Sequence, residues 1–296
     1  IVADLWTTRW QEMKSITVPV PEYAEQKRIV TFLDAQCAEI DAVLEKTRAS
    51  IEEYKKLKQA VITQAVTKGI HGDRPMKDSG IEWIGEIPAE WDVVRQKYFW
   101  NTVESGVSVN AADKPVDNSE QYGVLKTSAV SKFVFIPTEH KQVNLEEYGR
   151  VSCPVRADSI IASRMNTPEL VGACGYVQNN YPNLFLPDRL WQITFKDRLS
   201  PKYVWYYLSG IRVRQYISSL STGTSSSMQN ISQSQYGNIL ITIPSVEEQS
   251  EITKYLDEKY AGIDALIAKK QQYLTEIENY KKSLIYEYVT GKKEVV

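Results

Sequence analysis

Polar loops in the middle of the sequence carry the side chains best suited to contact nucleic acid. Amide and guanidinium groups read base edges, whereas hydroxyl groups and lysines bind phosphates. By this chemistry the candidate base or groove contacts are Arg164, Asn166, Ser225, Gln229 and Asn230. The candidate phosphate contacts are Ser108, Lys126 and Arg212. The composition alone leaves a second interpretation open, in which these are solvated loops and Arg212 lies on a solvated helix face.

Catalytic motifs are missing from the sequence. It contains no G-x-G-x-x-G loop, no G-x-x-x-x-G-K-[ST] loop and no G-x-S-x-G nucleophile elbow. Only His71 and His140 are available for histidine chemistry, and the three cysteines are dispersed without the spacing of a zinc site. We therefore expect no catalytic residue, no cofactor and no metal.

The elements that position the polar loops are organised by a repeat. Residues 16–34 return as residues 239–257 without a gap, at an offset of 223 positions, and the match continues to Thr67 and Thr290. The repeat is about sixty residues long, and unrelated sequence separates its copies. Adjacent units of a solenoid would follow one another directly, so the sequence does not predict a solenoid.

Each copy of the repeat predicts one long helix. Residues 25–68 contain neither proline nor glycine, and apolar residues recur at steps of three, four and seven. A helix of about 45 residues, roughly 65–70 Å long, cannot bury a single apolar stripe alone, so we expect the two helices to form an antiparallel coiled coil. The expected seam residues are Ile29, Leu33, Ile40, Leu44, Ile51, Val61, Ile252, Leu256, Ile263, Ile267, Leu274, Ile277 and Leu284.

Polar residues interrupt this seam at Thr47, Lys58, Lys270 and Lys281. They could fix the register of the helices, or the lysines could simply extend their charged ends into solvent. The sequence leaves both possibilities open, as it leaves open whether the helices pair within one chain or between two.

The remaining sequence predicts an α+β fold, with one mixed domain joined to the two helices. Short strand-like runs are expected at 93–98, 123–125, 132–136, 159–162, 175–177, 190–195 and 239–243, and one helix at 201–219. The expected domains are 19–70 and 244–292 for the helices and 71–243 for the mixed domain. Residues 1–18 are either a frayed segment or the remnant of a preceding domain, and their alignment with the end of the mixed domain favours the remnant.

The overall composition restricts the class of protein. A formal net charge of −2 over 296 residues provides no global basic field for nucleic acid, although a local patch is sufficient. No apolar run is long enough to span a bilayer, and no signal peptide is recognisable at the N-terminus. The unpaired cysteines are typical of a cytoplasmic protein with reduced thiols.

Five segments resemble the conserved regions of type I restriction–modification specificity subunits. They are residues 21–34 with their echo at 244–257, the stretch Lys77-Asp-Ser-Gly-Ile-Glu-Trp-Ile-Gly-Glu-Ile-Pro-Ala-Glu-Trp91, and the two helix ends at 59–69 and 280–291. The resemblance covers nearly the whole chain. This sequence departs from the family in holding one recognition domain where such subunits carry two, so it is similar to the C-terminal portion of a subunit or to a half-subunit.

The resemblance implies a non-catalytic subunit that reads one half of a bipartite site in double-stranded DNA. It implies that methyltransferase subunits bind the helices and that restriction subunits join the full complex, and we expect the polar outer faces of the helices to make the methyltransferase contacts. A homodimer would supply a second half-site. The alternative is a coiled-coil scaffold that presents a domain for a non-DNA ligand, and scattered rather than clustered cations would favour that alternative.

Overall fold

The computed structural model describes residues 10–225 and 228–295, and its fold is α+β. The chain divides into two compact units, one formed by residues 1–56 and 262–296 and the other by residues 57–261. Among the described residues, no helix combines the length and the apolar character needed to cross a membrane.

Two long helices correspond to the two copies of the repeat. Helix α2 (Tyr23–Lys68) has 46 residues and α6 (Val246–Val289) has 44. Acidic residues lie in the first turn of each, where they complement the helix dipole. Gly69 and Gly291 follow the ends with φ angles of 76° and 71°, a left-handed conformation that glycine adopts without strain at a helix C-terminus.

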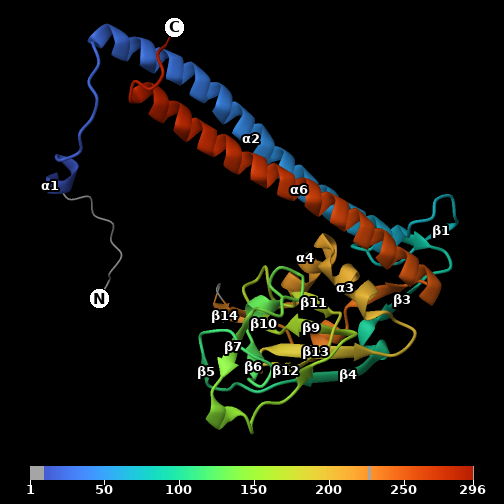
Figure 1. The fold of residues 1–296 in the computed structure, drawn as a ribbon. Helices are drawn as coiled ribbons and strands as arrows, with labels where there is room; N and C mark the ends of the chain where they lie inside the picture. The colour runs from blue at the N-terminus through green and yellow to red at the C-terminus, as the bar shows by residue number, and fades with distance from the viewer. Residues whose placement is uncertain (1–9, 226–227, 296) are drawn as a thin grey trace. The chain divides into compact units, whose positions relative to one another are not determined.

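In the first unit, α2 and α6 lie side by side and their apolar residues contact one another (Figure 1). Ile29 and Leu33 share a buried cluster with Leu284, and the rings of Phe32 and Tyr288 are 4.6 Å apart. Arg48 pairs with Glu278 at 2.6 Å. Partner numbers on α6 fall as residue numbers on α2 rise, so the two chain directions are opposite. Ten of the thirteen expected seam residues lie in this unit and are buried or half-buried, whereas Val61, Ile252 and Leu256 belong to the core cluster of the second unit.

The polar seam residues make specific contacts. Lys281 donates to both oxygens of Asp41 at 2.6 and 2.7 Å, and the Asp41 interaction raises the pKa of that lysine. The Lys270 ammonium lies 5.7 Å from the centre of the Tyr54 ring, and Thr47 donates to the carbonyl of Val43. Lysines 270 and 281 therefore contact the facing helix.

The expected remnant at 1–18 falls partly outside the described residues, because the structure describes the chain only from residue 10. Helix α1 (Trp10–Met13) is a single turn, and residues 16–20 are not in a strand. At the offset of 223, α1 aligns with residues 233–236 of α5 (Gln233–Gly237). A short helix therefore occupies the equivalent position before each copy of the repeat.

The second unit contains two main sheets and three small ones. The four-stranded sheet has the order β11 (Cys174–Val177), β9 (Ser159–Ser163), β13 (Leu190–Phe195) and β4 (Trp100–Ser105). The five-stranded sheet has the order β5 (Ala111–Ala112), β7 (His140–Val143), β6 (Gly123–Leu125), β12 (Tyr181–Phe185) and β8 (Pro154–Val155). All neighbouring strands are antiparallel except β6 and β12.

The small sheets complete the unit. The pairs are β1 (Met76–Asp78) with β2 (Glu86–Pro88), and β3 (Asp92–Arg95) with β16 (Leu240–Ile243). A three-stranded sheet has the order β10 (Met165–Asn166), β15 (Met228–Asn230) and β14 (Thr222–Ser225). Single 3₁₀ turns occupy Gln96–Phe99, Thr127–Ala129 and Leu145–Glu147.

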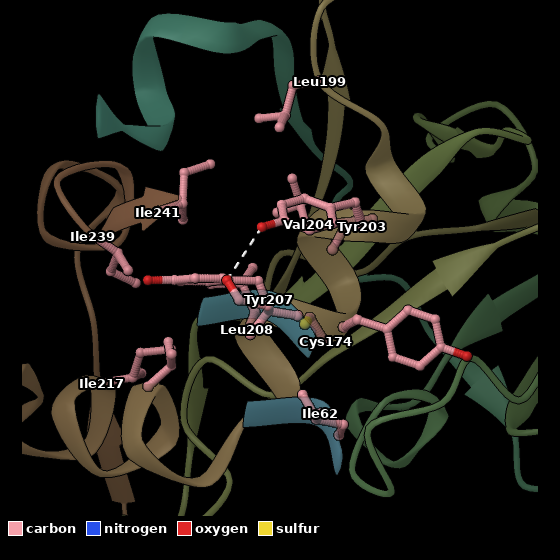
Figure 2. Close-up of a cluster of buried hydrophobic side chains, with 14 of the residues drawn as sticks. Ile62, Cys174, Leu199, Tyr203, Val204, Tyr207, Leu208, Ile217, Ile239 and Ile241 are labelled. Atoms are coloured by element: carbon pink, nitrogen blue, oxygen red, sulfur yellow. Dashed lines mark hydrogen bonds between the residues drawn. The ribbon is translucent and has the colours of Figure 1, made fainter. Parts of the chain in front are cut away.

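Helices α3 (Pro201–Ser209) and α4 (Ile211–Leu220) supply much of the core. Figure 2 shows Tyr203 and Tyr207 of α3 among Ile239 and Ile241, with Ile62 of α2 and Cys174 of β11 in the same cluster. The Tyr203 hydroxyl contacts the Thr242 hydroxyl at 2.7 Å, and Tyr207 donates to the carbonyl of Leu240 at 3.1 Å. Buried hydroxyl groups therefore have partners, as close packing requires.

Two expected elements are wrong. The helix expected at 201–219 is two helices, because the backbone is extended at Gly210 (φ −66°, ψ 139°). Residues 132–136 form a turn rather than a strand: Phe133 has a φ of 58°, and Ile136 donates to the carbonyl of Ala129. Trp205 of α3 donates its indole N–H to the Phe133 carbonyl at 2.7 Å, a tertiary contact that supports this turn.

Candidate nucleic-acid interface

The sheet β10–β15–β14 brings together two polar loops that are more than fifty residues apart in sequence. Asn166 pairs with Gln229 across β10 and β15, and Met165 pairs with Asn230. On the other side of β15, Thr222 pairs with Asn230 and Ser225 with Met228. Four of the five candidate base contacts, Asn166, Ser225, Gln229 and Asn230, therefore lie on one small sheet.

Arg164, the fifth candidate, lies where β9 leads into β10. Its backbone N–H donates to the carbonyl of Arg189 at 3.0 Å, and its carbonyl accepts from Ile231 just after β15. Arg164 is half-buried and Arg189 is exposed. In the part of the chain that the structure describes, neither guanidinium has a salt bridge or a side-chain hydrogen bond. The pair therefore leaves positive charge available beside the sheet.

Sequence reasoning missed Arg189. Arg189 immediately precedes β13, a strand that the sequence does predict. The available signal was therefore a cation just before a strand, next to a polar turn. What the sequence did not contain was the pairing of β9 with β13, which sets Leu190 opposite Ser163 and so brings Arg189 to Arg164.

Two asparagines on the sheet differ in their hydrogen bonding. The Oδ1 atom of Asn166 accepts from the backbone N–H of Thr167 at 2.9 Å. The Oδ1 atom of Asn230 is buried and has no hydrogen-bond partner among the described residues. A buried acceptor without a partner costs about 1–3 kcal/mol, and a donor on a bound ligand would recover that cost.

The three candidate phosphate contacts lie in different environments. Lys126 is 3.6 Å from Glu139, whose pKa is lowered by a hydrogen bond from Ser128 and by this lysine. Ser108 donates to Asp188 at 2.7 Å, next in sequence to Arg189. Arg212 lines a pocket with Thr63 of α2 and Trp83. No contact within 10–225 and 228–295 joins these three residues, so their role as phosphate contacts stays a prediction.

The most strongly shifted pKa values belong to core residues. Burial raises the pKa values of Tyr203, Tyr207 and Tyr236 well above the usual tyrosine range, and it raises the pKa of Cys174 to about 11. These groups are fully buried, so they do not form an open cleft of the kind that a catalytic site needs. Within the described residues, no group of three or more histidine, cysteine, aspartate or glutamate side chains could bind a metal ion.

Comparisons with known proteins agree on one family. Residues 88–276 match the family described as "Type I restriction modification DNA specificity domain". The chain is 27% identical to the type I restriction enzyme MjaVIII specificity subunit of Methanocaldococcus jannaschii, over 95% of this chain and 63% of that protein. It is 21% identical to the EcoKI specificity subunit of Escherichia coli, over 94% of this chain and 58% of that protein.

Solved structures share the fold. One chain from a structure of a type I R-M system aligns with a TM-score of 0.66 and 18% identity, over 93% of this chain and 62% of the other. The HsdS subunit from Thermoanaerobacter tengcongensis aligns with a TM-score of 0.51 and 17% identity, over 93% and 60%. The chain thus spans about three-fifths of the length of these relatives.

Proposed function

Because the chain belongs to the type I restriction modification DNA specificity domain family, we propose that its α+β domain recognises a specific sequence in double-stranded DNA. The observation that carries the proposal is the sheet β10–β15–β14, where Asn166 and Gln229 are paired residues. Amide side chains form directional hydrogen bonds with base edges, and Arg164 and Arg189 can bind guanine or phosphates beside them.

The domain reads one half of a bipartite target and contributes no catalytic residue. Methylation and cleavage belong to methyltransferase and restriction subunits that assemble with this chain. Support comes from the relatives, which are named specificity subunits, and from the sequence, which lacks the glycine-rich nucleotide-binding loops and the nucleophile elbow of common enzymes.

The two long helices act as an antiparallel coiled-coil spacer and as the docking surface for methyltransferase subunits. The cross-helix pairs Phe32–Tyr288, Asp41–Lys281 and Arg48–Glu278 support this arrangement within one chain. On the outward face of α6, Leu266, Tyr273 and Tyr280 are exposed at a spacing of seven residues among polar side chains. We assign docking to this outer face.

The repeat also supports the assignment of residues 71–243 as the recognition domain, of 19–70 and 244–292 as spacers and of 1–18 as the remnant of a preceding domain. Gln249 donates to the carbonyl of Pro244 and accepts from the backbone N–H of Ser200 in the domain. Gln26, at the equivalent position, makes the same local bond, to the carbonyl of Pro21. We infer that its amide oxygen accepts from a preceding domain of the same type.

The test is a selection from random duplexes by this chain after co-purification with its methyltransferase partner. We expect a stable complex that enriches one short, defined motif. Gln229→Ala should reduce the preference at one or two positions of that motif about tenfold, because one good side-chain–base pair discriminates by about 1–3 kcal/mol.

Lys77→Ala is the matched control, because Lys77 is an exposed cation of the same domain on the separate β1–β2 hairpin. This variant should enrich the wild-type motif unchanged. A complex that forms but enriches no motif would contradict the proposed function. Loss of preference in the Lys77 variant but not in the Gln229 variant would place DNA recognition on a different surface.

One observation favours the competing function, a scaffold that presents a domain for a non-DNA ligand. A pocket in the second unit is lined by Phe135, Tyr176, Tyr181 and Trp205 together with Lys202 and Asp257. Aromatic walls with a few polar groups are typical of small-molecule sites. Binding of a small aromatic ligand that quenches Trp205 fluorescence, with no motif enriched by the complex, would favour the scaffold.

A further inference from the structure

Arg214 is a buried cation on α4. It is 7% exposed, and no salt bridge to it is found in the described part of the chain. Its Nη2 atom donates to the carbonyls of Val171 and Glu169 at 2.6 and 3.2 Å, and its guanidinium carbon lies 4.9 Å from the centre of the Phe133 ring. Burial lowers the pKa of this arginine.

A buried charge without a counter-ion is costly, so the groups that Arg214 binds indicate what it stabilises. Both carbonyls belong to the loop at 167–173, which directly follows β10. The Nε and Nη1 atoms of Arg214 have no hydrogen-bond partner among the described residues. The arginine therefore directs its strongest hydrogen bonds at this one loop.

Short hydrogen bonds connect that loop to Asn166. Val171, whose carbonyl accepts from Arg214, donates its backbone N–H to the carbonyl of Thr167 at 2.8 Å. Thr167 in turn donates its own N–H to Oδ1 of Asn166 at 2.9 Å. Two backbone steps thus separate the buried guanidinium from the side chain on the reading sheet.

This connection fixes which end of the Asn166 amide is available. A backbone N–H can only donate, so the atom that faces Thr167 must be the amide oxygen rather than the nitrogen. The Nδ2 group is then the free end, and it has no hydrogen-bond partner within residues 10–225 and 228–295. Asn166 is therefore oriented as a hydrogen-bond donor before any DNA is bound.

We propose that Arg214 is a positioning residue that holds Asn166 as a donor to an acceptor atom on a base edge in the major groove. This inference rests on the proposed function. In the major groove guanine, adenine and thymine each present an acceptor, whereas cytosine presents only its N4 amino donor.

The experiment is the duplex selection with the methyltransferase complex, repeated with Asn166→Asp, Arg214→Lys and Arg214→Met. Asn166→Asp keeps the oxygen that accepts from Thr167 but replaces the Nδ2 donor with an acceptor. We expect the preference at one position to fall about tenfold or to change to another base pair, because a carboxylate oxygen needs a donor where Nδ2 needs an acceptor. That position identifies the base that Asn166 contacts.

Arg214→Lys keeps the charge, but the lysine side chain is one bond shorter than the path to Nη2 and has no planar group to lie against the Phe133 ring. We expect this variant to reduce the base preference at the same motif position about tenfold and to leave the preferences at the other positions unchanged. Arg214→Met, which also removes the charge, should flatten that position at least as much. A merely structural role would weaken binding uniformly and leave the relative preferences intact.

The outcomes separate this inference from the proposed function. If the wild-type complex enriches no motif, the proposed function fails. If it enriches a motif and Asn166→Asp alters no position, the role of Asn166 is refuted. If Asn166→Asp alters one position and both folded Arg214 variants leave it unchanged, the positioning role of Arg214 is refuted.

Discussion

At the residue scale, burial raises the pKa values of two cysteine thiols. Cys153 and Cys174 are buried, and burial raises the pKa of each thiol to about 11 from an ordinary value of 9.0. Cys37, on α2, is half-buried. The folded state therefore binds the protons of two thiols more tightly than the unfolded state does, which links the stability of the second unit to pH.

This linkage predicts a loss of stability at alkaline pH. Because the folded pKa values exceed the unfolded ones, the stabilisation is fully present below about pH 9 and is lost as pH rises towards 11. Each thiol should lower the free energy of unfolding by about 1.4 kcal/mol per pH unit in that window. Urea unfolding at pH 7, 9, 10 and 11 measures the slope.

A single substitution tests which thiol causes the slope of the free energy of unfolding against pH. Cys174→Ala should make it shallower by about one proton. An equal slope in wild type and Cys174→Ala would mean that burial does not perturb the Cys174 thiol. Buried Tyr203, Tyr207 and Tyr236 should steepen the decline further above pH 10 in both proteins, because their pKa values are also raised.

At the element scale, a glycine allows the turn at 132–136 to pack on the four-stranded sheet. A Cβ atom on Gly175 of β11 would lie 2.4 Å from the backbone nitrogen of Phe135. Neither backbone can move without disturbing the pairing of Gly175 with Ile161 or the bond from Trp205 to Phe133. The close approach of the two backbones therefore depends on the missing side chain.

Gly175→Ala should consequently destabilise the second unit by roughly 1–3 kcal/mol, the usual cost of overpacking a close-packed site. The measurement is the urea midpoint at constant m-value. Gly149→Ala is the matched control, since a Cβ atom there meets nothing within 4 Å, and it should change stability by less than about 0.5 kcal/mol. Equal effects of the two substitutions would refute the close approach.

At the scale of the whole molecule, charge limits how tightly the chain alone can bind DNA. The formal net charge is −2. Among the described residues, Arg164 and Arg189 are the arginines without salt bridges beside the sheet β10–β15–β14. Non-specific affinity depends on how many phosphates a protein neutralises, so partners that supply basic surface should contribute much of the affinity.

The chain alone should therefore bind duplex DNA weakly and with a strong dependence on salt. We expect dissociation constants of about 10⁻⁶ to 10⁻⁴ M near physiological salt, and at least a tenfold gain on adding the methyltransferase. Fluorescence anisotropy between 50 and 200 mM salt measures both. Tight, salt-resistant binding by the chain alone would contradict the dependence on partners.

The sequence by itself determined the long-range organisation of this protein. Helix formation depends on neighbouring residues, so the absence of proline and glycine from 25–68, the apolar spacing and the repeat were sufficient to predict α2, α6 and the burial of seam residues such as Leu33 and Leu284. The motif at 77–91 and the repetition of residues 21–34 at 244–257 also indicated the family, because each of these motifs consists of consecutive residues.

Only the tertiary structure decided how the candidate interface is assembled. The pairing of Asn166 with Gln229 joins segments more than sixty residues apart, and strand pairing at that separation leaves no local signal. The same reason explains why Arg189 was missed and why 132–136 is a turn. From the sequence, Arg214 is only an arginine on a helix. In the structure Arg214 is buried against the loop at 167–173, whereas Arg212 of the same helix is exposed.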